Sequence, residues 1–525
     1  MKILVTDPLS KEGVKILKEE GFEVDESGKL TSEVLAEKIK GYDGLIVRSG
    51  TKVLCQAIES ADKLKVIGRA GVGLDNVELE AATEKGIIVM NSPEGNTVST
   101  AEHAFALILS LLRNVPQAHQ SVKEGKWEKK AFTGTELYHK TLGVIGFGRI
   151  GQRMTQYARA FDMEVLVYDP FISEEKVLQT GATLVEKEVL VKNADIITLH
   201  TPLTEETKGM IGKKELALMK PDAFLINCAR GGLVDESALN ETLSAGNLKG
   251  SALDVFEQEP PAGNPVVNHP NVVVTPHLGA STEEAQVRVA VDICRQVADY
   301  LKRGIITNAA NLPSVSEKVL AVLQPYLDLC EKLGLFLVQM AGGRINEVQL
   351  EYYGEMADWD LSPLKHNFLK GLLSPCLGAG VNYINAPVLA RERGIRFSEI
   401  KSTTSAEFTN LITATADLSS GKVSVSGTLF GKKELRLVKI DGYLVDAVPE
   451  GFLLFCRNED KSGIIGKMGT VLGASQINIA GMTLGRKEKG GPALTILNVD
   501  APVPEEVLTK IKNIPEVNSV SLIKL

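Results

Sequence analysis

The chain has 525 residues and a formal net charge of −8, with 44% apolar and 24% charged residues. This composition is typical of a folded protein and excludes global disorder. The acidic balance argues against a general binder of nucleic acid or of anionic membranes. At roughly 150 residues per domain, the length predicts about three to four domains.

The cysteines are scattered and form no C-x-x-C pair; they are Cys55, Cys228, Cys294, Cys330, Cys376 and Cys456. This spacing fits neither a disulfide framework nor a zinc site and is typical of a reducing compartment. No apolar run is long enough to span a bilayer, and the first residues resemble a strand rather than a targeting signal. We therefore predict a cytoplasmic protein without a metal site and without membrane or nucleic-acid partners.

Two series of short apolar runs alternate with amphipathic segments in the first part of the chain. The first series covers residues 1–92, and the second starts near residue 141 and ends near 275. This alternation predicts parallel sheets with right-handed crossovers. Long helices are expected at 97–114 and 281–303, where the chain would pass between the two units. We therefore predict a discontinuous first domain, flavodoxin-like, at 1–95 and 283–308, around a second domain at 96–282.

The pattern changes after a linker at 308–313. A helix at about 316–341 and strands of period-two alternation at 422–430 and 434–440 predict an α+β third domain with an antiparallel sheet, at 314–448. From residue 452 the order strand, helix, strand, strand, helix, strand predicts a ferredoxin-like βαββαβ sandwich at 452–525.

A glycine-rich turn follows the expected strand at 142–145 and opens a helix; it comprises Gly146, Phe147, Gly148, Arg149, Ile150 and Gly151. These glycines allow a tight turn, a close approach to a pyrophosphate, and packing of the helix on the strand, while the helix N-terminus offers N–H donors. Asp169 ends the next strand, where a carboxylate accepts hydrogen bonds from an adenine-ribose 2′-hydroxyl and disfavours a 2′-phosphate. We predict a Rossmann-type domain that binds NAD; the alternative is that Asp169 only caps a turn.

Arg230, Glu259 and His277 each lie at or just past the end of a predicted strand, where ligands bind in open α/β sheets. Oxidation of an alcohol needs a base for the hydroxyl proton, and histidine suits that role near neutral pH. A carboxylate orients the ring, and an arginine can bind a substrate carboxylate in a bidentate manner. Each residue alone more often has a structural role, but together they favour chemistry.

Five ordered segments resemble the D-isomer-specific 2-hydroxyacid dehydrogenases; they are G-R-A-G-V-G-L-D-N-V, G-F-G-R-I-G, N-C-A-R-G-G, D-V-F-E-Q-E-P and T-P-H-L-G-A-S-T. The resemblance implies that Arg230 binds substrate, that His277 is the acid/base and that Glu259 is its partner. It also implies cofactor contacts beyond the glycine turn and Asp169, at Thr201, Cys228, Ala229, Asp254, Gly279 and Ala280.

Arg48, Ser49 and Arg69 follow strands of the first domain and carry donors suited to a phosphate, although a strand-end arginine can equally be a surface residue. Asn96 is a weaker substrate candidate, and His103 is expected to pack inside a helix. Over its full length the chain resembles the long form of the family. This resemblance implies oxidation of D-3-phosphoglycerate to 3-phosphohydroxypyruvate with NAD, the first committed step towards L-serine. The alternatives are a glyoxylate or hydroxypyruvate reductase of the same family and an NAD-sensing adaptor of the corepressor type.

The last segment resembles the ACT domain, which binds amino acids at dimeric interfaces, with Ser462-Gly463 in place of the usual Pro-Gly. Asn458, Asp460 and Asn478 match positions that hold an effector in serine-regulated relatives, so L-serine is the expected effector; the alternative is a cap and turn residues in a domain that only dimerises. The third domain resembles the intervening domain of the long form and implies an anion-binding regulatory role. The resemblance also implies a homo-oligomer, either a dimer or a tetramer.

Overall fold

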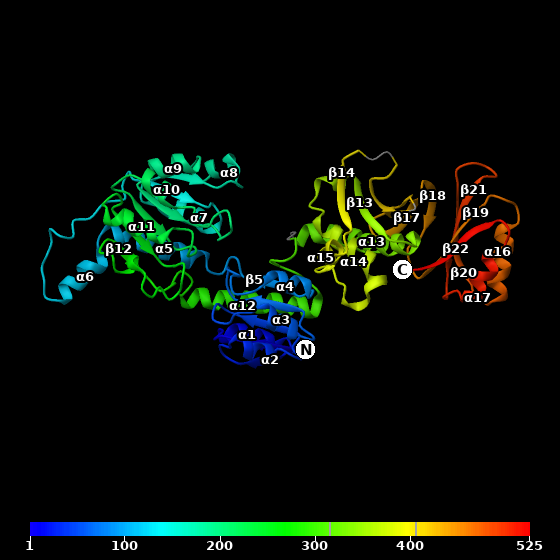
Figure 1. Ribbon diagram of the computed structural model, residues 1–525, viewed down its shortest axis with the longest axis horizontal. Helices are drawn as coiled ribbons and strands as arrows, with labels where there is room; N and C mark the ends of the chain where they lie inside the picture. The colour runs from blue at the N-terminus through cyan, green and yellow to red at the C-terminus, as the bar shows by residue number, and fades with distance from the viewer. Residues whose placement is uncertain (314–316, 405–406, 420) are drawn as a thin grey trace.

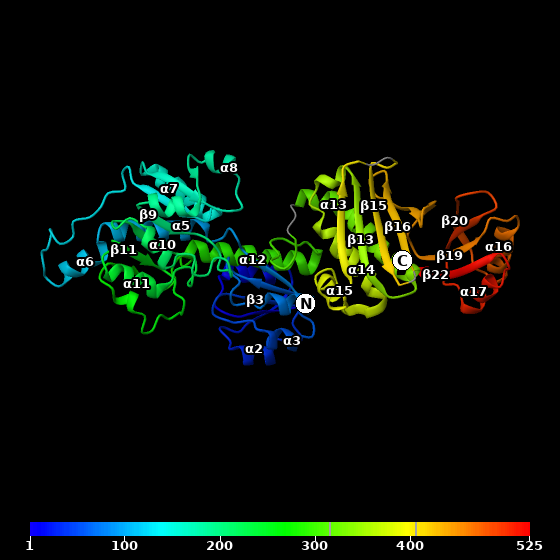
Figure 2. The same cartoon turned by 45° about the horizontal axis from the view of Figure 1, so that its top comes forward.

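The structure is a computed structural model that describes residues 1–313, 317–404, 407–419 and 421–525. The expected starts of the third domain at 314 and of its helix at 316 lie outside these residues. Four β-sheets in the described part of the chain form successive units of an elongated molecule (Figures 1 and 2).

The first lobe is a parallel sheet of order β2-β1-β3-β4-β5, which is the flavodoxin-like arrangement. Its strands are short, and all except the edge strand β2 are largely buried because helices cover both faces. One face packs against α1 (Lys11–Glu19) and α12 (Glu283–Arg303), and the other against α2 (Ser32–Lys38), α3 (Cys55–Ser60) and α4 (Leu79–Glu84). The strands are β1 (Lys2–Val5), β2 (Glu23–Glu26), β3 (Gly44–Val47), β4 (Val66–Arg69) and β5 (Ile88–Asn91).

The second lobe is a parallel sheet of order β12-β11-β10-β9-β6-β7-β8, so the expected Rossmann-type fold is confirmed. The strands are β6 (Thr141–Ile145), β7 (Glu164–Tyr168), β8 (Thr183–Leu184), β9 (Ile196–Leu199), β10 (Phe224–Asn227), β11 (Gly250–Leu253) and β12 (Val272–Val274). Helices α5 (Thr97–Leu112) and α7 (Arg149–Ala160) cover one face, and α9 (Lys187–Asn193), α10 (Lys213–Leu218) and α11 (Glu236–Ser244) the other. The lobe also carries α6 (Val115–Lys123), α8 (Glu174–Leu178) and the 3₁₀ turn Pro265–Asn268.

The chain crosses between the lobes twice. It leaves β5 of the first lobe, enters the second lobe through α5, and returns through α12, which packs on α1 and β4. Figure 1 shows α12 as the long green helix that runs from the second lobe to the first. The two lobes are therefore joined by two segments of the chain.

The third unit is a mixed sheet of order β14-β13-β15-β16-β17-β18. Its strands pair antiparallel except β13 with β14, which are parallel. The expectation of a wholly antiparallel sheet was wrong at this edge, because two helices between β13 and β14 return the chain to the same end. Its elements are α13 (Glu317–Ala341), β13 (Ile345–Gly354), 3₁₀ Glu355–Asp358, α14 (Ser362–Leu377), 3₁₀ Gly378–Gly380, α15 (Ala386–Glu392), β14 (Arg396–Ser402), β15 (Asn410–Leu418), β16 (Gly421–Phe430), β17 (Glu434–Ile440) and β18 (Tyr443–Ala447).

The C-terminal unit is an antiparallel sheet of order β20-β21-β19-β22 with two helices on one face, as expected for a βαββαβ sandwich. Its other face shares a hydrophobic core with α13, where the rings of Phe336 and Phe455 meet edge to face with centroids 5.9 Å apart. The elements are β19 (Phe452–Glu459), α16 (Ile464–Ala474), β20 (Ile479–Arg486), β21 (Pro492–Val499), α17 (Glu505–Lys512) and β22 (Val517–Lys524).

The third unit is fastened to the first lobe by the loop before α15. Asn382 Nδ2 donates to the Gly86 carbonyl at 2.9 Å, and Ile384 lies in the first-lobe core. A side chain at Gly86 would meet Asn382 at 2.3 Å, so this close approach depends on glycine. Among the described helices, none is both long and apolar enough to cross a membrane.

Candidate active site

His277 lies in the loop after β12 with its backbone in the left-handed region, at a φ of 57°. Its Nδ1 is 2.9 Å from Glu259 Oε2, and the Phe256 N–H donates to Glu259 Oε1 at 3.2 Å. Because Nδ1 faces a carboxylate, we assign the ring proton to Nδ1, which leaves Nε2 as the free proton acceptor. The side chains are 51% and 40% exposed, so the pair is accessible to a ligand.

Asp254, at the end of β11, holds the His277 loop in place. Its carboxylate accepts hydrogen bonds from Thr275 Oγ1 at 2.6 Å and from the backbone N–H groups of Leu278 and Gly279 at 2.7 and 2.9 Å. His103 Nε2 also lies 3.1 Å from the same carboxylate. Burial raises the pKa of Asp254, but these hydrogen bonds outweigh burial and hold the pKa below its usual value.

His103 therefore does more than pack inside α5. The sequence indicated only its helical position, since the contact with Asp254 joins residues 151 positions apart. Asp254 itself was predicted as a cofactor contact, and in the structure its carboxylate oxygens accept hydrogen bonds from the loop that carries His277.

Arg230 extends from the end of β10 towards the first lobe. Asn227 fixes its loop, donating to the Arg230 carbonyl at 2.8 Å and accepting from the Ala229 N–H at 3.0 Å. Arg230 Nε donates to Asp75 of the first lobe at 3.0 Å, and Nη1 donates to the Ala229 carbonyl at 2.7 Å. This guanidinium thus lies where the two lobes face each other.

Arg69 ends β4 with a largely buried guanidinium. Among the described residues, its Nε has no hydrogen-bond partner. Burial and the nearby Arg230 charge lower the pKa of Arg69 to about 10, so it stays charged at neutral pH. A buried cation without a partner lowers the stability of the fold through its desolvation penalty, unless a bound anion pairs with it.

Gly71 makes room for that guanidinium. A Cβ at this position, where φ is 144°, would lie 1.6 Å from Arg69 Nη1. Any side chain there would displace the Arg69 head group, so the position of this guanidinium depends on the glycine.

Arg48 follows β3 in a loop that is held by residues the sequence did not single out. The Asp7 carboxylate accepts from the N–H groups of Arg48 and Thr51 at 2.9 and 3.1 Å. Asn76 Nδ2 donates to the carbonyls of the same two residues at 2.7 Å each. The predicted phosphate loop is therefore rigid, and its charge acts on Arg69 together with that of Arg230.

The two further substrate candidates, Ser49 and Asn96, differ in their exposure to solvent. Ser49 is exposed in the Arg48 loop. Asn96 precedes α5, and its buried Oδ1 has no hydrogen-bond partner in the described part of the chain. A buried acceptor of this kind suits a ligand hydroxyl.

The glycine turn after β6 fits a dinucleotide. A Cβ at Gly146 would lie 2.6 Å from the His200 carbonyl oxygen, and one at Gly151 would lie 2.2 Å from the Gly146 carbonyl oxygen. Gly148 has no atom within 4 Å of its Cβ position. The outer glycines thus serve the protein's own packing, whereas the middle one borders open space at the start of α7, where N–H donors suit a pyrophosphate.

Asp169 ends β7 and accepts from the Phe147 and Phe171 N–H groups at 2.8 and 2.9 Å. The turn-capping alternative is therefore real, yet each carboxylate oxygen retains a lone pair for a ribose hydroxyl. Arg149 pairs with Glu94 at 3.3 Å, and Ile150 packs on the core behind the turn.

The remaining cofactor candidates follow the same edge of the second sheet. Thr201 follows β9, Cys228 and Ala229 follow β10, and Gly279 and Ala280 follow β12. Burial raises the pKa of the Cys228 thiol well above its ordinary value, so this cysteine is not a thiolate. Within the described ranges, no cluster of histidine, cysteine or acidic side chains has the arrangement of a metal site.

The candidate effector residues do not converge within one chain. Asp460 follows β19 and accepts from Arg486 Nη1 at 2.7 Å. Asn478 precedes β20 and donates to Asp500 at 2.7 Å. Because β19 and β20 run in the same direction, these residues lie at opposite ends of the sheet. Asn458 is buried, accepting from Thr495 Oγ1 at 2.8 Å.

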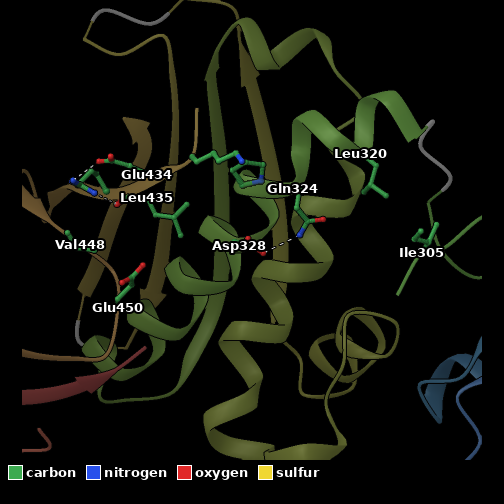
Figure 3. Close-up of a pocket in the computed structure, with 11 residues that line it drawn as sticks. Ile305, Leu320, Gln324, Asp328, Glu434, Leu435, Val448 and Glu450 are labelled. Carbon is green, nitrogen blue, oxygen red and sulfur yellow. Dashed lines mark hydrogen bonds and ion pairs between the residues drawn. The ribbon is translucent and has the colours of Figure 1, made fainter. Parts of the chain in front are cut away.

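A hollow of about 860 Å³ lies between α13 and the β17–β18 region of the third unit (Figure 3). Its charged lining comprises Asp328, Lys433, Glu434, Arg436 and Glu450. The Arg436 guanidinium is already paired with Glu434 at 2.9 Å and with Asp446 at 3.3 Å. Of the residues that the structure describes, three carboxylates and two cations therefore line this hollow.

Three family models match successive parts of the chain. They are the D-isomer specific 2-hydroxyacid dehydrogenase NAD binding domain at residues 105–279, the D-3-phosphoglycerate dehydrogenase intervening domain at 322–441, and the ACT domain at 452–516. D-3-phosphoglycerate dehydrogenase of Methanocaldococcus jannaschii is 48% identical over all of both chains, and that of Bacillus subtilis is 42% identical over 100% of this chain and 99% of the relative.

The chain belongs to the D-3-phosphoglycerate dehydrogenase family. Solved structures match its first two lobes. The TT0316 protein of Thermus thermophilus is 35% identical with a TM-score of 0.55, and D-lactate dehydrogenase of Aquifex aeolicus, solved with NAD and lactic acid, is 30% identical with a TM-score of 0.53. Each covers 59% of this chain and 100% of its own. Family membership accounts for the NAD-binding lobe and for the two units that follow it.

Proposed function

We propose that this protein oxidises D-3-phosphoglycerate to 3-phosphohydroxypyruvate with NAD, the first committed step of L-serine biosynthesis. The observation that carries this proposal is the full-length similarity to D-3-phosphoglycerate dehydrogenases, at 42 to 48% identity. The arginines between the lobes support it because a substrate with a phosphate and a carboxylate needs several cations.

The arginines divide between the two ends of the substrate. Arg48 and Arg69 bind the phosphate, with Ser49 as an added donor, and Arg230 binds the carboxylate end. The partnerless Nε of Arg69 supports this division, since a phosphate supplies the missing acceptor. Asn96 contributes its free Oδ1 to a substrate hydroxyl.

His277 takes the proton of the C2 hydroxyl on Nε2. Glu259 keeps the other ring nitrogen protonated and stabilises the imidazolium that forms, as their 2.9 Å contact allows. The positive charge of Arg230 stabilises the carbonyl group that forms at C2. The loop geometry set by Asp254 holds the imidazole in position throughout.

The second lobe holds the cofactor through the glycine turn, with the pyrophosphate at the N-terminus of α7 and the ribose at Asp169. When bound, NAD supplies the two-electron acceptor that the oxidation requires. The further contacts come from Arg149, Ile150, Thr201, Cys228, Ala229, Asp254, Gly279 and Ala280.

Turnover of D-3-phosphoglycerate with NAD, followed by the absorbance of the reduced cofactor, tests this function. We expect activity with NAD to exceed activity with NADP, and glyoxylate to be a poor substrate in the reverse direction. Activity on glyoxylate with none on the phosphate ester would refute the proposal.

We further propose the domain division at 1–95 with 283–308, 96–282, 314–448 and 452–525, a cytoplasmic location, and a homo-oligomer regulated by L-serine. The effector site would combine Asp460 and Asn458 of one chain with Asn478 of another. Their separation within one chain supports a site that needs two copies. Inhibition by L-serine that is weakened in Asn478→Ala and retained in Asn513→Ala, an exposed C-cap of α17, tests this assignment.

A further inference from the structure

Asp75 and Arg230 form an ion pair that joins the two lobes across their facing sides. Arg230 Nε donates to Asp75 Oδ2 at 3.0 Å although the residues are 155 positions apart. The Asp75 side chain is 66% exposed and that of Arg230 is 29% exposed. The Asp75 side chain is therefore free to turn into solvent, whereas the Arg230 side chain is held in place.

The backbone on either side of Asp75 is fixed. Asn76 donates to the carbonyls of Arg48 and Thr51, and Val77 pairs with Val53 in an isolated parallel bridge. Leu74 packs on the first-lobe core. Only the Asp75 side chain has to rotate for its carboxylate to leave Arg230.

Arg230 presents the edge formed by Nε and Nη2 to the first-lobe loop. Asp75 accepts from Nε, and a Cβ at Gly73 would lie 2.1 Å from Nη2, so the glycine allows this close approach. A carboxylate binds an arginine best when both of its oxygens face such an edge. Asp75 thus occupies part of the position that a substrate carboxylate would need.

We propose that Asp75 is a displaceable counter-ion, which occupies Arg230 in the free enzyme and yields it to the carboxylate of the substrate. The inference rests on the proposed function of Arg230. Binding is then an exchange of one carboxylate for another, and the return of Asp75 to Arg230 assists the release of product. Substrate affinity is weakened by this competition, and the anion site is partly neutralised between turnovers.

The test compares Asp75→Asn, which keeps the shape and removes the charge, with Glu80→Gln, an exposed acid in the first turn of α4. Calorimetry measures binding of D-3-phosphoglycerate to the full-length protein without NAD, and steady-state kinetics gives KM and kcat. Since an exposed ion pair typically contributes up to about 1 kcal/mol, Asp75→Asn should tighten binding and lower KM by about fivefold without raising kcat. Glu80→Gln should change neither.

A double-mutant cycle with Arg230→Ala shows whether Asp75 acts through Arg230, in which case its substitution has no effect in that background. The proposal is overturned if Asp75→Asn weakens binding, leaves it unchanged, lowers kcat at constant KM, or tightens binding equally without Arg230. Turnover by the unaltered protein tests the proposed function separately, because the calorimetric measurement requires no reaction.

Discussion

The arginine cluster between the first two lobes and the polar residues of the C-terminal unit differ in how their hydrogen-bonding groups are satisfied. Arg69 keeps a buried Nε without a partner among the described residues, and Asn96 likewise keeps a buried Oδ1. Asp460 and Asn478, by contrast, are paired with Arg486 and Asp500. The difference teaches that the first site, the arginine cluster, offers unsatisfied buried groups within a single chain, whereas the polar side chains of the C-terminal unit are already paired with other side chains of that unit.

The largest expected effect concerns His277 at this first site. Removing the base should lower kcat by about 10³-fold, within the usual range for general base catalysis, and change KM little. Steady-state kinetics of His277→Ala against His119→Ala, an exposed histidine on α6, measures this. If His277→Ala retained a tenth of the original kcat, His277 would not be the general base.

Arg69→Ala tests whether a partnerless cation marks the phosphate site. Losing one or two charge-assisted hydrogen bonds should raise KM for D-3-phosphoglycerate by roughly 10- to 100-fold. Arg69→Lys should give an intermediate KM because it keeps the charge without the fork of donors. Arg295→Ala, on the exposed face of α12, serves as the control, and an unchanged KM in Arg69→Ala contradicts the assignment.

Asp169 tests whether only unpaired groups mark a ligand site. Both of its carboxylate oxygens accept hydrogen bonds from the backbone, and we still assign it to the cofactor ribose. Asp169→Ala should reduce the preference for NAD over NADP in kcat/KM by about tenfold, since the variant loses one charged hydrogen bond and the repulsion of a 2′-phosphate. An unchanged preference would leave Asp169 as a turn cap.

His200 shows the limit of using unpartnered groups to find sites. Its buried Nδ1 has no partner in the described residues, while its Nε2 lies 3.0 Å from Thr198 Oγ1, and we assign no ligand to it. Burial lowers the pKa of His200 to about 3. Between pH 6.5 and 3 the His200 imidazole is therefore protonated in the unfolded chain and neutral in the folded chain.

The stability associated with His200 is therefore full above pH 6.5 and is lost as the pH falls towards 3, at about 1.4 kcal/mol per pH unit. The apparent unfolding midpoint of the second lobe, measured from pH 7.5 to 5.5, should fall less steeply in His200→Gln than in the unaltered chain. The exposed His119→Gln should keep the original slope. Equal slopes in all three proteins would show that His200 titrates normally.

The sequence predicts the second lobe well because periodicity locates its buried strands and polar residues follow them directly. The neighbouring positions of β10, β11 and β12 bring the loops of Arg230, Glu259 and His277 to one edge. The parallel pairing of β14 was missed because strand direction depends on the crossover and not on residue alternation.

The partners of the site residues were beyond prediction for a related reason. The contacts between Asp75 and Arg230, and between His103 and Asp254, join positions far apart in the chain. The first depends on how the two lobes face each other, and the second on how α5 packs on the second-lobe sheet. Asp460 and Asn478 were assigned to one effector site because they match effector positions of serine-regulated relatives. Strand direction separates them by the length of a strand.

The attachment of the third unit to the first lobe determines which part of the molecule can swing. Asn382 donates to the Gly86 carbonyl, and Tyr383 of the third unit packs with Tyr300 of α12 against the first-lobe core. The C-terminal unit is continuous with the third through the core on α13. A rotation at the two lobe crossings would therefore move the cofactor-binding lobe against the first lobe, the third unit and the C-terminal unit together.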